Sequence, residues 1–345
     1  MSSDRTRTLA SVIAAIPPEC YENPTHRGLL WLARDLLLYA ALIWGLASFD
    51  QIWVLVPLWL ISGAVISGLF ILGHDAAHGA LFGSKRLNYL VGQLAMLPSL
   101  HLYEAWVFGH NRIHHGHTIR QGMDYVWHPV TPAEYRALSP LGKLLHRVEW
   151  SALGAGVYYG RQIWWQQMIR FVPGEKMRAP IRRDRIVVGS WFALFSLALL
   201  GAGVASYGTL AGAVWMWVKV FAIPFVFWNY AIGFAVYVHH IAPEIPWFKR
   251  RDWTKFRGQV DGTTVLHMPR WVNFFFHNIF LHVPHHVDMR IPFYGLPKAV
   301  VAMREHFGDI LREKQYGIRD YLQTTRACKL FDFEEGVWLG YKSVR

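Results

Sequence analysis

The chain has 345 residues, of which 53% are apolar, and it contains 17 Trp, 21 Phe and 15 Tyr. Only 17% of the residues are charged, against about 25% in an ordinary soluble domain, which excludes a disordered chain and argues against a purely soluble fold. A net charge of +12 suggests contact with nucleic acid or with an anionic membrane surface, and two cysteines are too few for a disulfide framework or a cysteine-ligated iron–sulfur cluster.

The first predicted element is a short apolar stretch, residues 9–16, which we expect to form an amphipathic helix at the membrane surface. Four longer apolar segments follow, at residues 29–49, 52–73, 186–206 and 209–238. A helix needs about 20 apolar residues to cross about 30 Å of hydrocarbon, and each segment is long enough. Two of the segments have no charged residue, and the others contain only Arg34 with Asp35, and Lys219. Core helices of a soluble protein are the alternative, but they rarely have so few charges over such lengths.

Two tight joints, at residues 50–51 and 207–208, connect the segments into two helical hairpins and therefore lie on one side of the membrane. Of the 35 lysines and arginines in the chain, 34 lie on the other side: 4 in residues 1–35, 14 in residues 74–185 and 16 in residues 239–345. The remaining one is Lys219, within the fourth segment. Basic residues favour the cytoplasmic side, so we expect the termini and both large regions to be cytoplasmic. The positive charge then fits a membrane surface, and no nucleic-acid-binding motif is present.

The predicted fold is therefore an all-α integral membrane protein, with four transmembrane helices in two hairpins and a cytosolic, histidine-rich helical cap. We expect a single domain, residues 1–345, made of an interfacial segment at 1–28, the first hairpin at 29–73, a cytosolic region at 74–185, the second hairpin at 186–238 and a cytosolic region at 239–345.

Histidine is unusually frequent, with 18 residues against 23 carboxylates. Most of them form four groups on the side opposite the tight joints: His74 and His78; His110, His114 and His115; His239 and His240; and His282, His285 and His286. On a helix, residues four apart share a face, so His74 and His78 can direct two rings at one point, and the same holds for the pairs 110/114 and 282/286.

The adjacent pairs 114/115 and 285/286 direct their rings about 100° apart, which suits two metal ions better than one. Eight or nine imidazoles are too many for one tetrahedral zinc ion. Imidazole binds Fe, Cu, Zn and Ni, so the residues alone predict a two-metal site without choosing the metal. Ligating histidines usually donate their second N–H to a carboxylate or carbonyl, which makes Asp75, Asp124, Asp288 and Asn278 candidates for that supporting role.

The motifs HDAAH at residues 74–78, HNRIHH at 110–115 and HVPHH at 282–286, separated by two apolar hairpins, resemble the three histidine boxes of the membrane fatty acid desaturase superfamily. The flanking sequences, DYVWHPV from residue 124 and YVHHIAP from residue 237, are similar to delta-12/omega-3 acyl desaturases. The resemblance implies two iron ions held by His74, His78, His110, His114, His115, His240, His282, His285 and His286. It also places His240, rather than His239, at the position of a ligand outside the boxes.

By the same resemblance, the centre uses O2 to introduce a double bond into a lipid acyl chain. Two electrons are needed for each turnover, and the chain has neither a four-cysteine ferredoxin pattern nor a dinucleotide-binding motif, so an external donor of the ferredoxin or cytochrome b5 type is implied. The basic residues that could receive this donor, or instead hold lipid headgroups, are Arg182, Arg183, Arg185, Lys249, Arg250 and Arg251.

Three alternatives remain open at this point. A hydroxylase, carotenoid ketolase or acetylenase of the same superfamily would share the metal site and differ in how the substrate lies. A membrane zinc hydrolase would use HDAAH in place of HExxH, with Asp75 as a shorter base, but would leave the other histidines without a role. A haem or metal-transport membrane protein would carry single histidines deep within opposing helices rather than groups at their ends.

Overall fold

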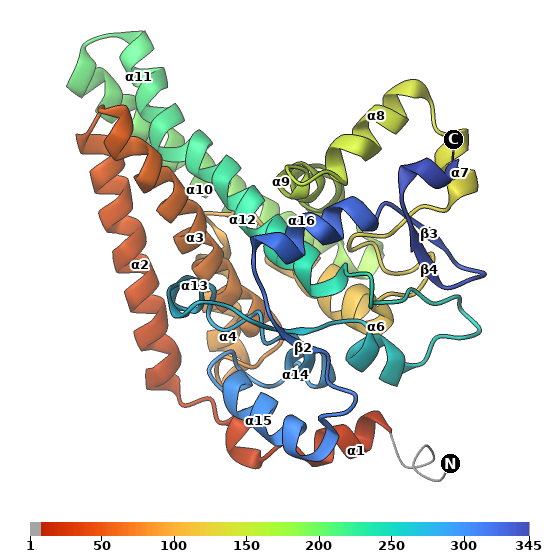
Figure 1. The fold of residues 1–345 in the computed structure, drawn as a ribbon. Helices are drawn as coiled ribbons and strands as arrows, with labels where there is room; N and C mark the ends of the chain where they lie inside the picture. Colours follow the sequence, from red (N-terminus) through yellow and green to blue (C-terminus); the bar gives the residue numbers. More distant parts are fainter. Residues whose placement is uncertain (1–7, 345) are drawn as a thin grey trace, which may run out of the picture. The chain divides into compact units, whose positions relative to one another are not determined.

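The computed structural model describes residues 8–344, so the beginning of the predicted interfacial segment 1–28 lies outside the described residues. The prediction of a mainly helical protein is confirmed (Figure 1). The contacts within the chain divide it into two compact units. We call residues 23–107 and 159–232 the span unit, and residues 8–22, 108–158 and 233–344 the histidine unit. The single domain 1–345 stays a prediction.

The span unit holds most of the apolar sequence. Its elements are α2 (Thr25–Ser48), α3 (Ile52–Ala77), α4 (Lys85–Met96), α5 (Tyr103–Trp106), the π-helix η3 (Tyr159–Ile169), α10 (Glu175–Tyr207), α11 (Leu210–Trp217), the π-helix η4 (Val218–Ala222) and the first part of α12 (Ile223–His240). Helix α2 packs beside α3, and α10 beside α11, which are the two predicted hairpins (Figure 1). Four helical segments are long and apolar enough to cross a membrane: 25–48, 52–77, 175–207 and 210–240.

All four of these helical segments extend beyond the predicted apolar segments at one end or both, and α3 and α10 are two examples. Helix α3 continues to Ala77 rather than ending at residue 73, so His74 lies in its last turn and His78 caps its end. Helix α10 begins at Glu175 rather than at residue 186, so its basic first turns are helical as well, and Pro180 lies inside the helix. The hydropathy of a sequence identifies the part of a helix that crosses hydrocarbon, so the predicted bounds left out the polar ends of these helices.

The fourth apolar segment contains a buried charge. Lys219 lies in η4 with its side chain fully buried, and its Nζ donates to the carbonyl of Phe49 at 2.9 Å and to Oδ1 of Asp50 at 2.8 Å. The Tyr207 hydroxyl accepts from the same Nζ at 2.8 Å and donates to Asp50. A buried lysine is tolerated only with such partners, and here they tie the two hairpin joints together. Burial would raise the pKa of Asp50, but hydrogen bonds led by that from Lys219 lower it to about 2.

The histidine unit is built from shorter elements. They are α1 (Leu9–Ala14), the 3₁₀-helix η1 (Pro18–Tyr21), the π-helix η2 (Val107–His114), α6 (His115–His117), α7 (Pro132–Ala137), α8 (Pro140–Glu149), α9 (Ala155–Tyr158), the end of α12, the π-helix η5 (Arg257–Asp261), α13 (Arg270–Phe276), α14 (His282–Val287), α15 (Leu296–Phe307), α16 (Ile318–Ala327) and the 3₁₀-helix η6 (Tyr341–Val344). Four short strands, which the sequence analysis did not predict, are β1 (Val265–His267), β2 (Glu313–Gln315), β3 (Leu330–Asp332) and β4 (Val337–Leu339).

The strands form two small sheets, with β1 parallel to β2 and β3 antiparallel to β4. The second sheet contributes Phe331 to an apolar cluster with Ile119 and Trp247. Since Ile119 follows the second histidine group in sequence, this cluster fixes the chain just after α6. The core of the histidine unit therefore lies directly beside its imidazoles.

Candidate metal centre

Ten histidines of the histidine unit are buried. Eight of these belong to the predicted groups: His110, His114, His115, His239, His240, His282, His285 and His286. Three elements supply them: the π-helix η2 with α6, the end of α12, and α14. These elements lie far apart in sequence, so the tertiary fold of this unit brings the histidine groups together.

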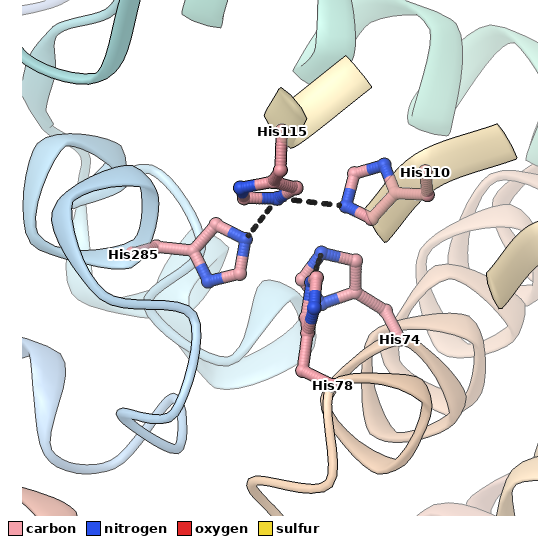
Figure 2. Close-up of side chains that lie close together, drawn as sticks. All are labelled: His74, His78, His110, His115 and His285. Carbon is pink, nitrogen blue, oxygen red and sulfur yellow. Dashed lines mark hydrogen bonds between the residues drawn. The ribbon is translucent and has the colours of Figure 1, made fainter. Parts of the chain in front are cut away.

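The π-helix η2 decides how the second group is arranged. In a π-helix the backbone bonds run from residue i to i+5, so residues five apart lie one turn apart. Nε2 of His110 and Nε2 of His115 are 3.2 Å apart, and the ring of His285 lies next to that of His115, with 3.2 Å between Nε2 atoms (Figure 2). The expectation that His110 and His114 are directed at one point was wrong, because it assumed an α-helix.

The ligand nitrogens fall into compact sets. Those of His110, His115 and His285 lie within 4.8 Å of one another, and the same limit holds for the set His114, His240 and His286 and for the set His239, His240 and His282. The adjacent residues of the pairs 114/115 and 285/286 thus enter different sets, as their 100° separation predicted. This arrangement has room for more than one ion.

Hydrogen bonds fix the orientation of these rings. Nδ1 of His114 donates to the carboxylate of Asp124 at 3.0 Å, and Nδ1 of His240 donates to the Gly262 carbonyl at 2.9 Å. The Asp124 carboxylate also accepts the backbone N–H groups of Ile119 and Val126. A ring whose Nδ1 donates to a pure acceptor presents a lone pair at Nε2, which is the form that binds a metal.

His282 and His286 provide a test of whether a cation fits. Nδ1 of His282 donates to the Ile279 carbonyl at 3.1 Å, and Nδ1 of His286 donates to Oε1 of Gln259 at 3.0 Å. Burial, together with the neighbouring imidazoles, lowers the pKa of both rings, so both are neutral at pH 7. Their Nε2 lone pairs then face each other at 3.2 Å with no proton between them. Such a pair is repulsive by itself and suits a bound cation.

The span unit carries the first histidine box at the end of α3. His74 and His78 lie one helical turn apart, with 3.3 Å between their Nε2 atoms, which confirms that the two residues share a helix face (Figure 2). Nδ1 of His74 lies 3.0 Å from the carboxylate of Asp75. The ring of Trp106 packs against that of His74 at a centroid distance of 6.4 Å.

The predicted supporting residues have different surroundings. Asp75 and Asp124 each contact a histidine, as described above, whereas Asp288 pairs with Arg290 through its carboxylate. Asn278 has a left-handed backbone, with φ of 56°, in the turn that places the Ile279 carbonyl before α14. Gln259 and the carbonyls of Gly262 and Ile279 were not predicted from the sequence, because backbone acceptors and a lone glutamine belong to no recognisable motif.

A pocket of about 240 Å³ in the histidine unit reaches the imidazoles from the surface. His115, His286 and Gln259 form part of its wall, and the exposed Lys255 lies at its edge. The pocket therefore gives small molecules a route to two of the candidate ligands.

The helices and imidazoles together define a membrane protein with a histidine-rich candidate metal centre. A family model described as fatty acid desaturase matches residues 51–316, so the chain belongs to the fatty acid desaturase family and is a membrane oxidoreductase of that family.

Individual relatives agree with this assignment. The chain is 30% identical over 324 residues to an sn-1 acyl-lipid omega-3 desaturase (ferredoxin) of Nostoc sp., and the aligned region covers 91% of this chain and 86% of that protein. It is 29% identical over 333 residues to an sn-1 oleoyl-lipid 12-desaturase of Picosynechococcus sp., where the alignment covers 94% of this chain and 90% of the relative. It is 28% identical over 332 residues to a chloroplastic omega-6 fatty acid desaturase of Glycine max, where the alignment covers 96% of this chain and 75% of the relative.

Proposed function

We propose that this protein is an O2-dependent, di-iron fatty acyl desaturase that introduces a double bond into the acyl chain of a membrane lipid, with electrons from an external donor. The observation that carries the proposal is the set of buried imidazoles whose ligand nitrogens converge in the histidine unit. Two of the relatives named above act, by their names, on acyl lipids, and the name of one of these includes ferredoxin.

We propose nine iron ligands: His74, His78, His110, His114, His115, His240, His282, His285 and His286. His240 is favoured over His239 because its Nδ1 donates to the Gly262 carbonyl, which leaves Nε2 as the metal-binding atom. His239 stacks on His282 with 3.7 Å between ring centroids, a contact suited to holding that ring in place.

In this proposal the protein holds the metal ligands in fixed orientations. The iron pair, when bound, supplies the oxidising power that takes two hydrogens from neighbouring methylenes of the substrate. No side chain has a pKa suited to deprotonating an alkyl C–H, so the chain itself contributes no acid–base step at that bond. Asp124 and Gln259 keep Nδ1 protonated on His114 and His286, so that Nε2 of each ring is the atom available to a metal.

The donor and the membrane complete the proposal. Four helices of membrane-crossing length support insertion into the bilayer, and the charge distribution favours cytoplasmic termini and a cytoplasmic metal site. We propose that a small acidic redox protein, of the ferredoxin rather than the cytochrome b5 type, meets the histidine unit where Lys255 borders the pocket.

The test is lipid analysis of a heterologous host that expresses the chain with a ferredoxin-reductase system. A product two mass units lighter than its acyl precursor is expected. Alanine at His78, His115, His240 or His286 should abolish this product, while alanine at the non-cluster residues His128 and His306 should preserve it.

The outcomes separate the alternatives. A product sixteen mass units heavier would replace desaturation by hydroxylation, and full activity of any two of the four cluster variants would refute the ligand assignment. Metal analysis of the purified protein should find about two iron atoms in each active chain. Zinc with hydrolytic activity would instead favour a hydrolase.

A further inference from the structure

A second pocket lies wholly within the span unit and is separate from the histidines. It is an apolar groove of about 360 Å³, within the range of roughly 300–1,000 Å³ that small-molecule sites occupy. Its walls are formed by Leu100, Leu102, Trp164, Val188 and Phe192. One charged residue, Arg185, lines it.

The α10 side of the groove is one helical stripe. Arg185, Val188, Gly189 and Phe192 follow the i, i+3, i+4, i+7 spacing that places residues on one face. Arg185 is the last charged residue before the uncharged run of residues 186–206. The arginine therefore marks the membrane interface, and the groove continues from it along the part of α10 that faces hydrocarbon.

Gly189 keeps the groove open. A Cβ atom built at this position would meet no atom within 4 Å, and because Gly189 lines the groove, a larger side chain there would take up space in it. Glycine within a helix costs about 1 kcal/mol relative to alanine. That cost is consistent with a need for space beside the helix.

The charge of Arg185 is not neutralised by the protein. Its Nη2 donates to the carbonyls of Ile169 and Phe171, and in residues 8–344 no carboxylate pairs with it. Its other N–H groups remain available, and a guanidinium presents them in the geometry that binds a phosphate. Neighbouring Arg183 differs, because its Nη2 lies 3.6 Å from Glu104.

The inner wall of the groove leads to the first histidine box. Leu100 and Leu102 flank the buried His101, whose ring lies 5.5 Å from that of Trp106. The Trp106 ring in turn packs against His74. Within the span unit, two aromatic rings thus separate the groove wall from a candidate iron ligand.

We propose that this groove binds a membrane glycerophospholipid, with its phosphate on Arg185 and an acyl chain along Gly189, and that it is the lateral entrance for the substrate. The inference rests on the proposed function for its role as an entrance, but not for the binding of the lipid. Arg185 at the membrane interface suits the phosphate of such a lipid, and the apolar groove beside it suits an acyl chain.

The test uses the full-length protein in phosphatidylcholine nanodiscs that contain phosphatidylglycerol with a diazirine-bearing acyl chain. After irradiation, peptides covering residues 100–102, 164–169 and 185–192 should carry the label. Gly189→Phe, and Gly189→Leu as a second variant, should reduce this labelling at least tenfold. Gly201→Phe, a substitution at another exposed glycine of α10 with open space around it, should leave it within twofold. Arg185→Gln should reduce labelling several-fold, and Arg182→Gln should not.

Labelling needs neither iron nor an electron donor, so its result is independent of catalysis. Specific labelling in a protein that makes no double bond would support the lipid site and refute the proposed function. No labelling of the wild-type groove, or equal labelling in the Gly189 and Gly201 variants, would overturn the lipid site. If a folded Gly189→Phe variant is no longer labelled but still desaturates lipid at the wild-type rate, the groove is not the entrance for the substrate.

Discussion

Gln259 accepts the Nδ1–H of His286 at 3.0 Å, while its side-chain amide donates to the carbonyl of His115. One uncharged side chain therefore sets the tautomer of one candidate ligand and holds the backbone of another. Both bonds require a group that accepts at one end and donates at the other, which among side chains of this shape only an amide does.

Replacing Gln259 by leucine should lower iron retention and activity by about 10–100-fold, the usual effect of removing a partner of a ligating histidine. Gln259→Glu should also impair iron retention, because a carboxylate cannot donate to the His115 carbonyl. The measurement is iron content per chain alongside turnover. The control is Gln323→Leu at an exposed position of α16, and equal iron content in both leucine variants would contradict the role of Gln259.

Asp124→Asn should disturb the His114 ring and the loop after it. The Asp124 carboxylate accepts hydrogen bonds from His114 and from two backbone N–H groups. An asparagine has one acceptor oxygen, so its NH2 group would face at least one of these donors. A buried donor left without an acceptor costs about 1–3 kcal/mol. We expect lower iron content and a lower unfolding temperature, compared with Asp309→Asn as a control on the surface.

Lys219→Met should weaken the tie between the hairpin joints. The substitution keeps most of the apolar volume but removes the donor to Phe49, Asp50 and Tyr207. We expect a destabilisation of about 0.5–1.5 kcal/mol, the usual net contribution of a hydrogen bond, because Phe49 and Asp50 are exposed and water can replace the lysine there. Thermal unfolding in detergent would show it, and an unfolding temperature equal to that of the wild type would show that the tie is energetically neutral.

Lys255→Glu should impair electron delivery without changing the metal site. Because Lys255 borders the pocket that reaches His115 and His286, reversing its charge should raise the apparent KM for ferredoxin several-fold, most at low salt. Activity with a small chemical reductant should stay unchanged. Lys85→Glu, at the exposed start of α4, is the matched charge reversal, and an equal effect there would refute specific docking.

Lys329 should make stability depend on pH. Burial lowers the pKa of this lysine to about 8, below the value of 10.5 that it has when unfolded. Between these values the unfolded chain binds the proton and the folded chain does not, so stability should rise from pH 8 to pH 10.5, by up to about 3 kcal/mol. Lys329→Met should flatten this rise in thermal unfolding temperature, whereas Lys342→Met should retain it.

The sequence by itself determined the membrane helices and the residue types of the site. Uncharged runs of about 20 residues specify hydrocarbon-crossing helices regardless of what packs against them, because backbone hydrogen bonds must be satisfied locally there. The i, i+4 spacing of His74 with His78, and of His282 with His286, likewise depends only on helix geometry.

Only the tertiary structure decided which imidazoles share a set and what orients them. The π-helix η2 pairs His110 with His115 instead of His114, and its extra residue per turn is not specified by any local pattern. Gln259 and the Gly262 carbonyl reach the rings across more than 20 residues of chain. Such contacts depend on how distant segments pack, so they could not be predicted from residue spacing and composition.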